Sequence, residues 1–262
     1  MNGSARRMED YSDPFSHDPA VEKTVTPLWK EAKWGFEWAS LRYSRVYYGR
    51  GVTRGNGAPI MLVPGFMAGD YMLLEMQWWL RRIGYESFLS NITWNNDCPD
   101  KTAAALTHRI RRVYDETGRK VTLVGHSLGG LLIKSVSQDH PELVQSVITM
   151  GSPFKEIVKA HPAIVGIWDH LKAAQGGVIG RNLLSSCGTG HCTCNFVRNI
   201  MQPRKTIPPQ FAIYSKGDGV VDWESCMEDD LDSNAEVRGT HIGMVYNADV
   251  FRALADRLAE ST

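Results

Sequence analysis

A serine between two glycines is the residue of this sequence best suited to chemistry. Ser127 lies in the segment 125–129 (Gly-His-Ser-Leu-Gly), which matches the pattern Gly-x-Ser-x-Gly. A serine hydroxyl is a weak nucleophile at neutral pH, and it attacks a carbonyl carbon when a neighbouring base accepts its proton. β-Favouring residues 121–124 precede this segment, and helix-compatible residues 131–138 follow it. The sequence therefore predicts a nucleophile on a sharp turn between a strand and a helix.

The glycines on either side of Ser127 have a spatial role in this prediction. Side chains at positions 125 and 129 would collide with the neighbouring strand and helix, so Gly125 and Gly129 permit the turn. The N–H groups at the start of the following helix would then lie beneath Ser127 and favour negative charge there. The alternative is a glycine-rich turn in which the serine takes no part in chemistry.

Residues 121–130 (Val-Thr-Leu-Val-Gly-His-Ser-Leu-Gly-Gly) resemble the nucleophile turn of the α/β-hydrolase family, in particular that of its lipases and esterases. The resemblance covers about residues 58–150 and 208–260. It implies a two-step acyl transfer, in which Ser127 attacks an ester carbonyl, the alcohol leaves, and water then releases the acid. It implies no metal and no cofactor. In this family an acid and then a histidine follow the serine along the chain.

Two later segments match the partners that this resemblance implies. Residues 214–222 (Tyr-Ser-Lys-Gly-Asp-Gly-Val-Val-Asp) resemble the lipase segment that carries the acid, so Asp218 is the predicted acid and Asp222 the alternative. His241 follows a predicted strand and precedes the last predicted helix, where the family has its histidine. Asp218 would orient His241, and His241 would accept the proton of Ser127.

Two backbone N–H groups are predicted to stabilise negative charge on the attacked oxygen. One belongs to Leu128, directly after the serine. The other lies in residues 64–69 (Pro-Gly-Phe-Met-Ala-Gly), which resemble the oxyanion loop of lipases with Pro64 where histidine is usual. By that match the donor is the N–H of Phe66, and Met67 is the second choice. The departure at Pro64 affects only the hydrogen bonds that usually fix this loop, because the donor is a backbone group.

The elements that must position these residues alternate along the chain. Hydrophobic patterns predict strands at 60–63, 85–89, 121–124, 144–150, 211–214 and 235–238, and helices at 71–83, 100–117, 131–138 and 245–258. Such alternation is typical of an α/β fold, with a mostly parallel sheet and helices on both faces. Together with the resemblance, it predicts an α/β-hydrolase fold.

The alternation stops after Gly151, and this break predicts the domain organisation. Residues 152–207 lack a clear strand, which indicates a lid or cap inserted into the core. The core is predicted to comprise residues 58–151 and 208–262. Residues 1–57 are predicted to form an irregular leader and a helix packed on the core.

The predicted N-terminal helix, between residues 28 and 47, is unusually aromatic. Its apolar residues recur at helical spacing: Leu28, Ala32, Phe36, Ala39, Tyr43 and Val46. One interpretation is a helix at a lipid interface or a substrate tunnel. The favoured interpretation is a helix packed onto the body of the domain.

Composition limits the possible partners of this chain of 262 residues. Lys and Arg number 29 and Asp and Glu number 29, so neither nucleic acid nor anionic lipid has an electrostatic basis for binding. No apolar run is long enough to span a membrane, and the first 20 residues have no apolar signal region. These features, with an odd number of cysteines, predict a cytoplasmic protein.

A cluster of cysteines in the predicted lid allows a different site. Cys187, His191, Cys192 and Cys194 are zinc-ligand types, although a single residue between Cys192 and Cys194 is tighter than the usual spacing. A disulfide within this cluster or with Cys226, or plain thiols, are the other possibilities. We expect no metal site.

The function predicted from the sequence is hydrolysis of a small-molecule or lipid ester with an apolar acyl chain. Many Trp, Met and Leu residues near the oxyanion loop and in the lid suggest an apolar acyl pocket. A thioesterase or an acyltransferase could use the same three residues. A protein of this fold that binds without turnover is the alternative from another class, and it would be expected to have lost one of the three.

Overall fold

A six-stranded sheet forms the centre of the protein. The computed structural model describes residues 28–155, 194–201 and 207–261. The strands are β1 (Pro59–Val63), β2 (Glu86–Leu89), β3 (Val121–His126), β4 (Val144–Met150), β5 (Gln210–Tyr214) and β6 (Asn234–Glu236). They lie in the order β2-β1-β3-β4-β5-β6, and every neighbouring pair is parallel. The predicted parallel sheet is confirmed, and its six strands lie close to the predicted positions.

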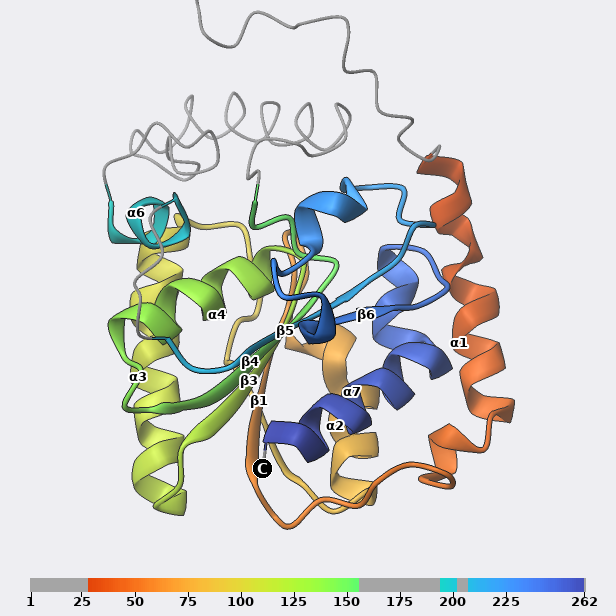
Figure 1. Cartoon of the computed structure of the whole chain (residues 1–262), viewed down its shortest axis with the longest axis horizontal. Helices are drawn as coiled ribbons and strands as arrows, with labels where there is room; N and C mark the ends of the chain where they lie inside the picture. The colour runs from red at the N-terminus through yellow and green to blue at the C-terminus, as the bar shows by residue number, and fades with distance from the viewer. Residues whose placement is uncertain (1–27, 156–193, 202–206, 262) are drawn as a thin grey trace, which may run out of the picture.

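Helices cover both faces of this sheet (Figure 1). One face carries α3 (Pro99–Thr117), α4 (Leu128–Asp139) and α6 (Asn195–Met201), and the other carries α2 (Leu74–Arg82) and α7 (Ala248–Ser261). A helix α1 (Trp34–Tyr43) lies outside α2 and α7, preceded by the 3₁₀ helix η1 (Leu28–Lys33). Because both faces are covered, β1 and β3 are buried along their whole length, which explains their continuous apolar runs.

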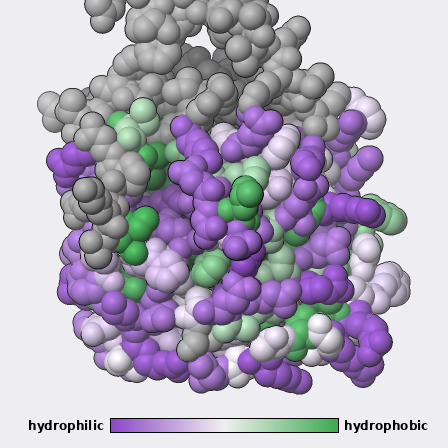
Figure 2. All heavy atoms as spheres, viewed as in Figure 1, coloured by the Kyte–Doolittle hydropathy of each residue, from purple (hydrophilic) through white to green (hydrophobic). Residues whose placement is uncertain are grey.

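The hydrophobic side chains form two cores, one on each side of the sheet. One core joins the sheet to α2 and α7 and contains Trp79 and Phe251, whose ring centroids are 4.6 Å apart. The other joins the sheet to α3, α4 and α6 and contains Leu132 and Phe196. The face seen in Figure 2 is mostly hydrophilic, with scattered hydrophobic residues, as expected when the cores lie within.

The helix α6 lies within the segment that the sequence assigned to the lid. Its Phe196, Val197 and Ile200 are buried in the core beside α3 and α4. Residues 156–193 and 202–206 of the predicted lid lie outside the described residues, as do the predicted leader residues 1–27.

The N-terminal helix packs against the domain, but through a different side than its apolar spacing predicts. Phe36 and Tyr43 are 78% and 91% exposed, whereas Leu41 and Val46 are buried. Glu31 is also buried, because loops at the end of the sheet present backbone N–H groups to it. The predicted apolar stripe was therefore wrong at Phe36 and Tyr43: polar contacts, rather than hydrophobic periodicity, set the orientation of this segment.

The turn after β3 can be tested through its glycines. A Cβ atom at Gly129 would lie 2.3 Å from the carbonyl oxygen of Val63, so Gly129→Ala forces β1 and α4 apart. We expect this change to lower the free energy of unfolding by about 1–3 kcal/mol in urea denaturation. Gly35→Ala is the control, since a Cβ there meets nothing within 4 Å and alanine in a helix should add roughly 0.5–1 kcal/mol. Equal effects of the two changes would contradict this account.

Candidate active site

Ser127 lies at the carboxyl end of β3, directly before α4, in strained backbone. Its φ of 52° and ψ of −123° lie outside the regions that residues with a Cβ prefer. The turn holds this geometry because strand and helix approach closely: a Cβ at Gly125 would lie 2.6 Å from backbone atoms of Gly129 and Gly130. The predicted turn between strand and helix is thus present in the structure, with Ser127 at its apex.

Asp218 and His241 lie on the two loops that follow β5 and β6. Since parallel strands end at the same edge of the sheet, these loops reach the edge at which Ser127 lies. His241 Nδ1 donates a hydrogen bond to Asp218 Oδ2 over 2.6 Å, and both residues are 5% exposed. The other carboxylate oxygen of Asp218 accepts the N–H groups of Val220 and Val221 at 2.8 and 2.9 Å. The carboxylate is therefore held in one orientation toward the imidazole.

The charges around His241 favour its protonated form. Burial alone would lower the pKa of His241, but the carboxylates of Asp218 and Glu31 outweigh burial and raise this pKa above its ordinary value. An imidazole with a raised pKa is a better proton acceptor, provided that the pH is high enough to keep it neutral.

His126, the residue before Ser127, supports the loop of His241. Burial and the neighbouring His241 ring lower the pKa of His126 to about 3, so its ring is neutral. Its Nε2–H donates to the backbone carbonyl of His241 at 3.0 Å, and the two ring centroids are 4.8 Å apart. A neutral ring fixes the position of the histidine loop without adding a positive charge beside it.

The loop that follows β1 is fixed by Asn95, a residue that the sequence analysis did not identify. The Asn95 side-chain amide donates to the carbonyl of Pro64 at 2.8 Å, and its backbone carbonyl accepts the N–H of Met67 at 3.0 Å. Its backbone N–H donates to the carbonyl of Ala68 at 2.8 Å. These three bonds hold the loop from Pro64 to Ala68 against Asn95. They also engage the N–H of Met67, so this second-choice oxyanion donor is already bonded.

Ser127, His241 and this loop enclose one cavity of about 280 Å³. Its described wall is mostly apolar and includes Phe66, Met72 and Val245. Among the described residues no hydrogen bond joins the Ser127 hydroxyl to His241. Both side chains line the same cavity, so one bound molecule can contact both of them. Catalytic hydrogen bonds are often long before substrate binds and shorten in the complex.

The other candidate residues lie elsewhere. The Asp222 side chain accepts the N–H of Glu224 at 3.2 Å, at the start of the 3₁₀ helix η5 (Trp223–Cys226), while Asp218 faces His241. Cys226 is buried, and this burial raises the pKa of its thiol. Cys226 is a free thiol, so a disulfide with Cys226 is not formed in this structure. Cys187, His191 and Cys192 lie outside the described residues, so the expectation of no metal there and the alternative of a disulfide within that cluster stay predictions.

Two residues that position the site carry only weak sequence signals. Asn95 follows the carboxyl end of β2, where polar residues often serve a function, but nothing in its immediate sequence indicates a link to Pro64. Glu31 lies in a segment that its aromatic residues dominate, and its carboxylate nevertheless bonds to the loops of Asp218 and His241.

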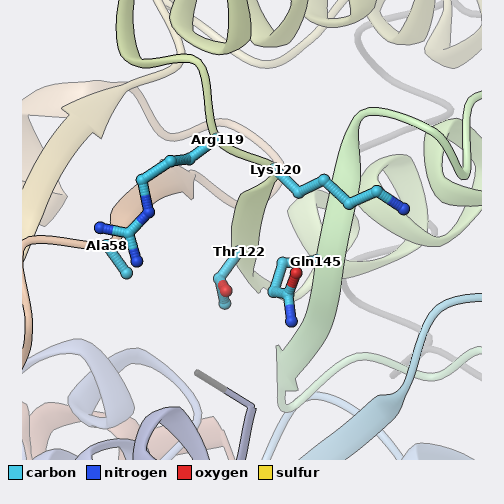
Figure 3. Close-up of a pocket in the computed structure, with 5 residues that line it drawn as sticks. All are labelled: Ala58, Arg119, Lys120, Thr122 and Gln145. Carbon is cyan, nitrogen blue, oxygen red and sulfur yellow. The ribbon is translucent and has the colours of Figure 1, made fainter.

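A second pocket, of about 250 Å³, lies at the opposite edge of the sheet, near the start of β3 and β4. The pocket is lined by Ala58, Arg119, Lys120, Thr122 and Gln145. In Figure 3 the Arg119 side chain points toward Ala58, and the Lys120 side chain points away from both residues. The Thr122 hydroxyl is hydrogen-bonded to Ser146 Oγ at 3.2 Å, and Lys120 Nζ donates to the carbonyl of Pro141 at 3.2 Å, so this pocket does not compete with the cavity at Ser127 as a catalytic site.

Two features that could indicate another function, a metal-binding cluster and a membrane-spanning helix, are absent from the part of the chain that the structure describes. Within 28–155, 194–201 and 207–261, no group of three or more His, Cys, Asp or Glu side chains is placed to hold a metal ion. None of the helices described in these ranges is long and apolar enough to cross a membrane.

Comparison with known proteins adds independent information on this arrangement. A family model for the alpha/beta hydrolase fold matches residues 84–176. Two curated triacylglycerol lipases, from Pseudarthrobacter phenanthrenivorans and Burkholderia plantarii, are each 29% identical to the chain in an alignment of length 149 that covers 50% of this chain. The aligned region is 46% and 41% of the two lipases, so the chain spans less than half of the length of either relative.

Solved structures give the same fold over most of the chain. A lipase from Bacillus licheniformis aligns with a TM-score of 0.54 at 17% identity, over 79% of this chain and 94% of that one. A metagenomic carboxyl esterase aligns with a TM-score of 0.58 at 14% identity, over 80% and 78% of the two chains. The parallel sheet, the family model over residues 84–176 and these similarities show that the chain has the α/β-hydrolase fold, and the proteins it is similar to include lipases and esterases.

Proposed function

We propose that this protein is a serine-dependent carboxylic ester hydrolase that forms an acyl-enzyme intermediate. Ser127 is the nucleophile, His241 the general base, and Asp218 the acid that orients the imidazole. The observation that carries the proposal is the hydrogen bond of 2.6 Å between buried Asp218 and His241, together with a cavity whose wall contains both His241 and a serine in strained backbone. The lipase relatives supply the class of bond that is cleaved.

In the proposed first step, Ser127 Oγ attacks the ester carbonyl carbon while its proton passes to His241 Nε2. The carbonyl oxygen becomes an oxyanion, which accepts hydrogen bonds from the N–H groups of Phe66 and Leu128. Leu128 opens α4, and the first N–H groups of a helix have no partner within the helix. The protonated His241 then gives its proton to the departing alcohol. Water repeats the sequence on the acyl-enzyme and releases the acid.

The apolar wall of the cavity indicates which part of the substrate lies there. Phe66, Met72 and Val245 offer an apolar surface and no charge, so we propose that the cavity takes the acyl chain of the ester. The polar groups that face it are those of His126, Ser127 and His241.

The test is hydrolysis of p-nitrophenyl esters from acetate to palmitate, together with labelling by a fluorophosphonate probe. We expect turnover of at least part of this series and one covalent adduct, located at Ser127 by mass spectrometry. If the protein were labelled at Ser127 but inert on every ester, the assignment of Ser127 as nucleophile would stand and esters would be excluded as substrates. Thioesters would then be the next substrates to test. A protein that is neither labelled nor active would contradict the proposal.

Asn95→Ala tests the proposed oxyanion loop. This change removes the hydrogen bond to Pro64 while the backbone bonds to Met67 and Ala68 can remain. We expect kcat to fall about 10- to 100-fold with KM changed less than about threefold, because a displaced donor weakens the transition state more than the bound ester. Asn96→Ala is the control and should leave kcat within about twofold of the unmodified protein. A loss in KM alone would argue against this role.

A further inference from the structure

The N-terminal segment bonds to both loops that carry the proposed acid and base. In Figure 1, α1 lies at the edge of the molecule, beside the loops that follow β5 and β6. Glu31, in η1, is 5% exposed. Its Oε1 accepts the N–H of Gly219 at 2.9 Å and that of His241 at 3.0 Å, and its Oε2 accepts the N–H of Ile242 at 2.8 Å. One side chain thus joins the residue after Asp218 to His241 itself.

A second carboxylate, that of Glu37 in α1, bonds to the same loop at Thr240, the residue before His241. Glu37 Oε1 accepts the N–H of Thr240 at 2.9 Å, and Glu37 Oε2 accepts the Thr240 hydroxyl at 2.9 Å. The Thr240 hydroxyl in turn accepts the N–H of Gly243 at 3.0 Å. These bonds fix the start of the turn on which His241 lies, but they do not reach the loop of Asp218.

We propose that Glu31 is a positioning residue for the reaction, in that its buried carboxylate holds the loops of Asp218 and His241 together at the distance their hydrogen bond requires. This inference rests on the proposed function for its kinetic consequence. The support is geometric: a carboxylate removed from water needs hydrogen-bond donors, and the three backbone N–H groups that bond to Glu31 belong to the two loops. Displacement of such loops by about 1 Å costs on the order of 100-fold in rate.

The charge of Glu31 has a second consequence, at the imidazole itself. The charged or titratable groups that face His241 are Asp218, Glu31 and the neutral His126. The negative charges of Asp218 and Glu31 both raise the pKa of His241. Removal of the charge at position 31 therefore lowers the pKa of His241. His241 then stays neutral to a lower pH, so the acidic limb of the pH–rate profile moves to lower pH.

The experiment compares Glu31→Gln with Glu37→Gln. Glutamine at position 31 loses the charge and turns an NH₂ group toward the N–H of Ile242 or of Gly219 and His241, so two donors face each other. Glutamine at position 37 keeps an oxygen for the Thr240 N–H and offers its NH₂ to a lone pair of the Thr240 hydroxyl. For Glu31→Gln we expect kcat to fall about 10- to 100-fold, KM to change less than about threefold, and the acidic limb to move to lower pH. For Glu37→Gln we expect rates within about threefold and an unmoved limb.

An NMR titration of the His241 ring distinguishes failure of this inference from failure of the proposed function. It requires no substrate, and it should give a lower pKa for His241 in Glu31→Gln than in the unmodified protein and in Glu37→Gln. Glu31→Asp keeps the charge but shortens the reach, so it should retain the His241 titration while kcat falls. Unchanged titration and unchanged kcat in a folded Glu31→Gln protein would overturn the inference. Inactivity of the unmodified protein on all esters, with the titration behaving as expected, would remove the proposed function alone.

Discussion

Replacement of Ser127 by alanine is expected to lower kcat for ester hydrolysis by on the order of a millionfold and to abolish fluorophosphonate labelling. Alanine retains the Cβ and removes only the hydroxyl oxygen, so the turn after β3 should fold as before. With no nucleophile, the imidazole of His241 has no hydroxyl proton to accept and no acyl-enzyme can form. The residual rate should reflect substrate binding and the oxyanion donors alone. The measurement is kcat on the best p-nitrophenyl ester, with circular dichroism as the test of folding.

Another serine at the same edge of the sheet provides the control. Ser152 follows β4, is fully buried, and donates its hydroxyl to the carbonyl of Met150 at 3.3 Å. Ser152→Ala should cost about 1 kcal/mol in the free energy of unfolding and change kcat less than about threefold. If Ser127→Ala kept most of the activity, another residue would have to be the nucleophile, and the proposed mechanism would be wrong.

Replacement of Asp218 by asparagine is expected to lower kcat by on the order of ten-thousandfold. The carboxylate oxygen that accepts the Nδ1–H of His241 fixes the imidazole with Nε2 unprotonated toward the serine. An asparagine can turn its NH₂ group to the ring and favour the opposite tautomer. Loss of the carboxylate also removes a cause of the raised pKa of His241.

Asp218→Asn should also change the pH dependence of the reaction, in a direction that follows from the pKa of His241. His241 acts as a base only when it is neutral, so the activity of the unmodified protein should fall as the pH drops through the raised pKa of His241. In Asp218→Asn that pKa is lower, and the small residual activity should persist to lower pH. The measurement is kcat/KM as a function of pH for both proteins.

Asp222→Asn separates the two candidate acids. Asp222 caps η5 through the N–H of Glu224, and asparagine also caps helices well. We therefore expect a kcat within about threefold of that of the unmodified protein. A greater loss for Asp222→Asn than for Asp218→Asn would reverse the two assignments.

The sequence predicts the framework of this protein better than it predicts the contacts that refine the site. Hydrophobic runs identify β1 and β3, because residues buried on both faces of a sheet must be apolar. The segment around Ser127 is recognisable because the turn needs glycines at two fixed positions. Asp218 and His241 follow from chain order in a family whose residue order is constant.

Glu31 and Asn95 escape such reasoning for a physical reason. Each acts through hydrogen bonds to backbone atoms, and backbone partners leave no mark on the sequence at the other end of the contact. Glu31 is 188 residues from Gly219 and 211 from Ile242 along the chain, so no local pattern links them. The orientation of the N-terminal segment was mispredicted for the same reason, since its buried residues include Glu31 in η1 as well as the apolar Leu41 and Val46.

The strained backbone of Ser127 bears on how natural selection acts on this protein. A residue in this region of φ and ψ costs of the order of 1–3 kcal/mol, and glycine would remove most of that cost. Selection for stability alone would thus replace the serine, since the protein gains by losing it. A native protein has only about 5–15 kcal/mol of stability to lose, so this trade-off is a sizeable share of the total. A serine at this position therefore lowers the stability of the fold, and the proposed activity of its hydroxyl would account for that cost.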